Sequence, residues 1–69
     1  MPYMSIAELP ERVRNHLPPR AQAIYMEVFN HAWVQYSNRE DREVIAHKVA
    51  WAAIKKRYEK RGDQWVKKS

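Results

Sequence analysis

The stretch that decides the fold runs from Arg39 to Arg61 and reads REDREVIAHKVAWAAIKKRYEKR. Wound as a helix, its apolar residues cover almost the whole circumference and leave only a narrow polar strip. Helices with this pattern are typically buried, and the several alanines allow neighbouring helices to approach closely. We therefore expect this helix to be the central element around which the others pack.

Both ends of this helix carry recognisable signals. Ser37 and Glu40 fit the S-x-x-E capping box, which predicts a start near Arg39. The basic last turn is followed by Gly62, the residue type that helix C-termini prefer, so the helix is predicted to end there.

Two more helices and a short strand are predicted on either side. Proline opens a short helix at about 10–16, and a second proline pair ends it, because proline suits only the first turn. A second helix follows from Pro19 to about Tyr36 on a broad apolar face. Residues 63–69 are expected to form a strand that pairs with residues 2–4. The predicted class is a mainly α, compact three-helix domain over residues 1–69, with small β pairing between the N- and C-terminal segments.

Composition limits the classes of function. The 69 residues suffice for one small domain, and the absence of cysteine excludes disulfides and thiolate metal sites. The net charge is +5, and the whole excess comes from residues 39–69. Such a balance suits an acidic partner, which could be nucleic acid, an anionic membrane or an acidic protein.

Targeting and membrane-spanning signals are not recognisable in the sequence. The first residues lack the basic and apolar regions of a secretory signal. The longest apolar-rich segment, Val44 to Ile54, is interrupted by His47 and Lys48 and is too short to span a bilayer. A cytoplasmic location without a membrane span is therefore expected.

Catalytic, metal and cofactor sites are not expected. The three histidines, at positions 16, 31 and 47, are not spaced as ligands on one helix face, and His47 is expected to pair with Glu43 one turn away. A single glycine cannot build a phosphate-binding loop. The sequence therefore predicts a protein that is not an enzyme.

Basic residues are the most informative polar feature. Cations in the last turn of a helix oppose its macrodipole, which explains part of the charge. Their number exceeds what capping requires, so a surface that binds an anion or an acidic partner is the alternative interpretation. The candidate binding residues are Lys48, Lys55, Lys56, Arg57, Lys60, Arg61, Lys67 and Lys68. The tryptophans and tyrosines could stack on nucleic-acid bases, but their helical spacing favours a role in the core.

Several separated blocks resemble the ChaB family of cation transport regulators, which is named for its genetic association with an antiporter. The blocks, in order, are Leu9-Pro10-Glu11, Leu17-Pro18, Ala21-Gln22-Ala23-Ile24-Tyr25, Phe29-Asn30-His31-Ala32-Trp33, Ala46-His47-Lys48-Val49-Ala50-Trp51-Ala52-Ala53-Ile54-Lys55 and Trp65-Val66-Lys67-Lys68-Ser69. The resemblance covers nearly the whole chain, although the connection around residues 37–43 is shorter than in the family's enteric member. It implies a helical fold with small strand pairing between the chain ends and a genetic association with a sodium/calcium–proton antiporter.

Two hypotheses follow. In the first, the chain is a regulatory module whose basic second half binds an acidic protein partner, either a cation antiporter or an associated factor; the antiporter is implied by the resemblance alone. In the second, the same cations contact phosphates and the chain is a nucleic-acid-binding accessory domain, an alternative supported by family-like domains that occur beside nucleic-acid-binding domains. The sequence indicates no oligomeric state.

Overall fold

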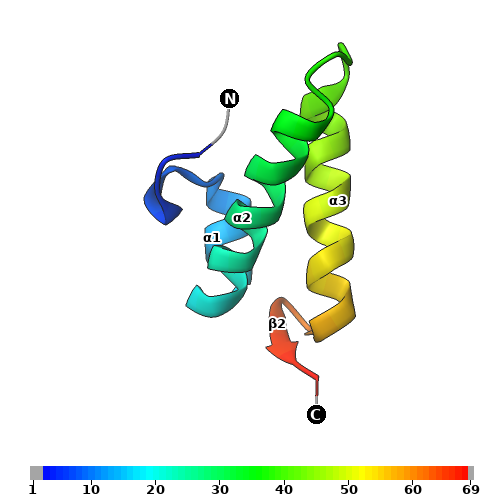
Figure 1. Ribbon diagram of the computed structural model, residues 1–69. Helices are drawn as coiled ribbons and strands as arrows, with labels where there is room; N and C mark the ends of the chain where they lie inside the picture. The colour runs from blue at the N-terminus through cyan, green and yellow to red at the C-terminus, as the bar shows by residue number, and fades with distance from the viewer. Residues whose placement is uncertain (1–2, 69) are drawn as a thin grey trace.

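The computed structural model describes residues 3–68 (Figure 1). Its elements follow the chain in the order η1 (Ile6–Glu8), α1 (Glu11–His16), α2 (Pro19–Gln35), α3 (Arg42–Arg57), β1 (Tyr58–Arg61) and β2 (Gln64–Lys67). The predicted class, a mainly α three-helix domain with a small sheet, is confirmed. Over the described residues, no helix is both long enough and apolar enough to cross a membrane.

Helices α2 and α3 form an antiparallel pair that supplies most of the core (Figure 1). Pro19 occupies the first turn of α2, where its missing N–H has no intrahelical acceptor. The contact is built from residues spaced about one turn apart on the two helices: Ala21, Tyr25, Phe29, Ala32, Ala46, Ala50 and Ile54. The buried alanines of α3 and the buried rings of Tyr25 and Phe29 on α2 belong to one core cluster, and this combination of small with large side chains lets the helices pack closely.

The central element is α2, and the prediction that α3 is central was wrong. Besides α3, the second helix contacts both α1 and η1, and Phe29 packs against the ring of Tyr3 with centroids 4.8 Å apart. Helix α3 buries a single stripe, and on its other sides Val44 remains 54% exposed and Val49 36% exposed. A chain of 69 residues has too few other elements to cover the second apolar side of α3.

The connection between α2 and α3 also differs from the prediction. Ser37 lies in a turn directly after α2, and its N–H donates to the carbonyl of Val34. Helix α3 begins at Arg42 with Asp41 at the N-cap position, and no side-chain capping bond forms there. The capping box of Ser37 and Glu40 is therefore absent, because residues 36–41 are used to reverse the chain.

The C-terminal strand forms as predicted, but with a different partner. β2 pairs antiparallel with β1, in the register Tyr58↔Lys67, Glu59↔Val66, Lys60↔Trp65 and Arg61↔Gln64. Helix α3 thus ends four residues before its predicted limit, and Gly62, with φ of +62°, turns the hairpin instead of capping the helix. A hairpin closed by two residues orders far less chain than pairing of the two chain ends would.

The predicted N-terminal strand over residues 2–4 does not form at Tyr3 or Met4, whereas Pro2 lies outside the described residues. The backbone of Tyr3 bonds to the side-chain amide of Asn30 on α2. Its N–H donates to Asn30 Oδ1 at 2.8 Å, and its carbonyl accepts from Asn30 Nδ2 at 2.8 Å. One asparagine therefore satisfies the backbone groups that a neighbouring strand would have satisfied.

Candidate functional site

The main surface feature is a groove around Trp51, formed where α1, α3 and the hairpin meet. Three adjoining hollows share this side chain, with volumes of about 600, 390 and 450 Å³. We call this surface the tryptophan groove and define it by Pro10, Arg12, Val13, His16, Tyr25, Val44, His47, Lys48, Trp51, Ala52, Lys55, Lys60 and Trp65.

Aromatic contacts fix the floor of the groove. Trp51 is half-buried and lies edge-on to the buried ring of Tyr25, with centroids 5.2 Å apart. Trp65 reaches it from β2 at a centroid distance of 5.6 Å. A hydrogen bond of 2.7 Å between His16 Nδ1 and the carbonyl of Asp63 ties α1 to the hairpin turn. The groove therefore has a defined shape, although α1, α2, α3 and the hairpin all contribute side chains to it.

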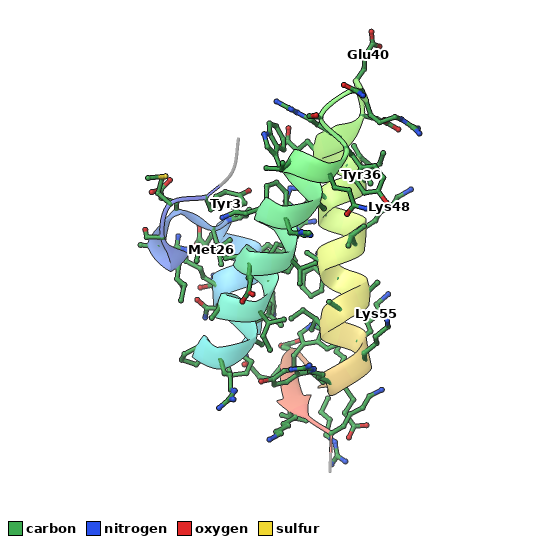
Figure 2. The ribbon with its side chains drawn as sticks, viewed as in Figure 1. Tyr3, Met26, Tyr36, Glu40, Lys48 and Lys55 are labelled. Atoms are coloured by element: carbon green, nitrogen blue, oxygen red, sulfur yellow. The ribbon has the colours of Figure 1, made fainter. Side chains whose placement is uncertain are left out.

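All charged side chains that line the groove are cationic. Lys48 and Lys55 extend from the same side of α3, away from α2 (Figure 2). Lys60 stands opposite Trp65 in the hairpin register and lines the hollow between Trp51 and Trp65. Arg12 joins them from α1. Like charges around an apolar surface give it a positive potential that favours an anionic ligand.

Arg12 is the groove cation that the sequence prediction missed, and Trp51 and Trp65 were predicted to serve the core. The first 38 residues carry no net charge, so the charge pattern predicted binding cations only in the second half of the chain. The available signal was local: Arg12 and His16 are four residues apart and therefore share one face of the predicted first helix. Only the packing of α1 beside α3 shows that this face borders the basic residues.

The remaining predicted cations do not join the groove lining. Lys56 and Arg57 border a different hollow together with Glu27 of α2. Arg61 pairs with Glu59 at 3.3 Å, and both alternate away from the strand face that holds Lys60 and Trp65.

Lys67 and Lys68, at the end of the hairpin, are both exposed. Lys67 stands opposite Tyr58 in the register, which places it on the same strand face as Lys60. The backbone N–H of Lys68 donates to the carbonyl of Arg57 at 3.0 Å. The eight predicted residues are thus divided among several surfaces, of which the groove takes Lys48, Lys55 and Lys60 into its lining.

His47 pairs with Tyr25 and not with Glu43 as predicted. Its Nδ1 is 2.5 Å from the Tyr25 hydroxyl. Burial lowers the pKa of His47 below its ordinary value, and the nearby charge of Glu43 opposes this effect only in part. Burial also raises the pKa of Tyr25 above its ordinary value. The pair is therefore neutral at pH 7 and adds no charge to the groove floor.

Metal-ligand geometry is not found within residues 3–68, where no three His, Asp or Glu side chains cluster. Among the described residues, none that lines the groove carries a carboxylate, so the lining supplies no oxygen ligands for Ca²⁺ from acidic side chains. The arrangement of this surface suits recognition of an anionic partner.

Comparison with known proteins identifies the family. A family model described as ChaB matches residues 9–68. The chain belongs to the ChaB family. Among its ChaB relatives, the proteins from Escherichia coli K12 and Shigella flexneri, both named "Putative cation transport regulator ChaB", are 53% identical over 76 aligned positions that cover each chain completely.

A solved ChaB structure has the same fold. The NMR solution structure of the "putative cation transport regulator ChaB" matches with a TM-score of 0.87 and 52% sequence identity, covering 99% of this chain and all of the other. Every residue of the tryptophan groove lies within the stretch that the ChaB model matches. The groove therefore belongs to the ChaB domain itself.

Proposed function

We propose that this ChaB family member is a single-domain, non-enzymatic regulatory protein that binds an acidic segment of another protein in the tryptophan groove. The observation that carries the proposal is the groove lining, in which Arg12, Lys48, Lys55 and Lys60 surround Trp51 and no residue between positions 3 and 68 contributes a carboxylate. Cations that converge from separate elements favour a ligand that brings several negative charges.

Cation transport is the proposed setting. The relatives from Escherichia coli and Shigella flexneri carry names that assign them to its regulation. The resemblance to the family adds an association with a sodium/calcium–proton antiporter. The proposed partner is accordingly an acidic cytoplasmic segment of a cation antiporter or of a factor associated with it.

Nucleic-acid binding is the alternative, and the distribution of charge favours it less. Proteins that hold nucleic acid without sequence preference use a continuous cationic surface along the phosphate backbone. Here Lys56 and Arg57 border a separate hollow, and Arg61 pairs with Glu59, so these three cations lie away from the groove. The rings of Trp51 and Trp65 also pack against each other, which leaves less of each ring free to stack on a base.

A matched pair of charge reversals tests the proposal. The double variant Lys55→Glu/Lys60→Glu changes the groove, whereas Lys56→Glu/Arg57→Glu makes the same change in net charge outside it. Calorimetry would measure the affinity of each variant for peptides that copy the acidic cytoplasmic segments of a cation antiporter. We expect the groove variant to bind about tenfold or more weakly, and the control to bind within about threefold of the parent.

Two results would contradict the proposal. Equal losses in both double variants would mean that only net charge matters and that the groove is not the site. Unchanged binding by the groove variant would exclude its cations from recognition. Circular dichroism of both variants would check that the fold is retained. We expect it to be retained because all four substituted side chains are exposed.

A further inference from the structure

We infer that the groove recognises an acidic segment with an apolar side chain, aromatic or branched aliphatic, between its carboxylates. This inference rests on the proposed function and adds the chemistry of the partner. It follows from the layout of the tryptophan groove, whose apolar part around Val44 and Pro10, bordered by Lys48, adjoins a cationic part beside Trp65.

The apolar part is an uncovered extension of the core. Trp51 is a large side chain that packs on Tyr25 from one side and remains only half-buried. Val44, two turns earlier on α3, is 54% exposed in the same hollow, where Ala52 is also exposed. Apolar residues that adjoin a partly exposed tryptophan in a hollow are typical of the anchoring part of a protein interface.

The cationic part brings together three charges that the fold does not neutralise. Arg12, Lys55 and Lys60 come from α1, α3 and β1 and line one hollow with both tryptophans. Within residues 3–68, ion pairs join only Arg39 to Asp41 and Arg61 to Glu59, so none of these three has an ionic partner. The macrodipole of α3 accounts for Lys55 alone, because the other two lie outside its last turn.

The apolar and the cationic part of the groove together define the chemistry of the bound segment more closely than the cationic part does by itself. A purely acidic segment gains only exposed charge pairs, each of which contributes little and is screened by salt. An apolar side chain placed on Trp51 buries additional surface and brings the neighbouring carboxylates beside the cations. A mixed segment is therefore expected to bind about tenfold or more tightly than an acidic segment of equal charge.

The test uses peptide probes and the three tryptophan indoles. One ten-residue peptide alternates Phe and Leu with Glu and Asp, and its control carries Ser in place of Phe and Leu at the same charge. Titrations of the isotopically labelled full chain would follow the indole N–H signals by NMR. The mixed peptide should shift Trp51 and Trp65 in the groove and leave Trp33 unchanged, since Trp33 packs against Phe29 and beneath Arg42 elsewhere.

Single charge reversals localise the binding. Arg12→Glu should weaken the mixed peptide about tenfold, whereas Arg57→Glu, with the same change in charge, should retain its affinity within about threefold. Lys60→Glu provides a second groove variant that leaves α1 untouched. Equal effects of Arg12→Glu and Arg57→Glu would overturn the assignment of the site.

Three further outcomes would also overturn the inference. Equal binding of both peptides without indole shifts would show that the apolar part of the groove does not contribute to binding, while the proposed binding of an acidic segment would be retained. No binding of either peptide at low salt would reject the proposed function as well. Tighter binding of a single-stranded oligothymidylate, with shifts of the same two indoles, would assign the groove to nucleic acid.

Discussion

Trp51→Ala removes the floor of the groove and tests how far this side chain contributes to the fold. Its ring contacts Tyr25 at 5.2 Å and Trp65 at 5.6 Å between centroids. One side remains open to the groove, and the residue as a whole is half-buried. The fully buried Phe29 of α2 provides an internal comparison.

The expected loss follows from burial. Truncation of a fully buried Phe or Trp to Ala costs about 3–5 kcal/mol. Partial burial reduces this cost to roughly two-thirds, a figure that includes the ring contacts with Tyr25 and Trp65. We therefore expect Trp51→Ala to lower the free energy of unfolding by about 2–3 kcal/mol, and Phe29→Ala by about 3–5 kcal/mol. A total stability of roughly 5 kcal/mol would keep the Trp51 variant folded at room temperature.

Denaturant unfolding followed by far-ultraviolet circular dichroism measures both losses without relying on tryptophan fluorescence. A loss for Trp51→Ala that equals or exceeds that for Phe29→Ala would refute the conclusion that α2, and not α3, is the central helix. A loss below about 1 kcal/mol would refute the contribution of the contacts with Tyr25 and Trp65.

Three further predictions concern single residues. Tyr25→Phe removes the hydroxyl that bonds to His47 and should lower the free energy of unfolding by about 1 kcal/mol in urea titrations, whereas a change below about 0.3 kcal/mol would contradict a bond between the two. Burial lowers the pKa of His47 in the folded chain. The unfolded chain therefore takes up a proton at this residue at a higher pH than the folded chain does. The stability that neutral His47 contributes is present above about pH 6.5 and is lost as the pH falls through the folded pKa. Urea midpoints between pH 8 and pH 5 should show this decrease, and His47→Gln should reduce it; an equal decrease in that variant would assign the effect to other groups. Gly62→Ala should lower the free energy of unfolding by about 1–2 kcal/mol because of the positive φ of +62°. The added Cβ would meet no atom within 4 Å, so the loss comes from the backbone conformation alone. Thermal unfolding should show a smaller loss for Gly62→Asn.

Helix positions could largely be predicted from the sequence, whereas the ends of α3 could not. Prolines 10 and 19 and the apolar spacing of residues 21–36 limited the first two helices to within about one residue. The same local rules misplaced the ends of α3, because Ser37 and Gly62 each suit a turn as well as a helix cap. Local sequence signals indicate which conformations a residue tolerates. Whether these two residues form a helix cap or a turn depended on which segments could pair.

The candidate site could be predicted in part. The charge pattern predicted eight candidate cations, which include the groove residues Lys48, Lys55 and Lys60. Charge alone does not distinguish these three from the five that lie outside the groove lining. Sequence distance hid Arg12, which stands 43 positions before Lys55 and lines the same hollow. A site assembled from three elements has no contiguous pattern in the sequence.

By itself the sequence determined the helical class, the ChaB blocks and the basic second half, because propensity, periodicity and formal charge are properties of the chain. Tertiary structure decided that α2 is the central helix, that β2 pairs with its neighbour β1, and that Arg12 joins two lysines around Trp51 and Trp65. These outcomes depend on which surfaces are buried against one another. A chain of 69 residues can bury only part of its apolar surface, and the part left uncovered became the groove.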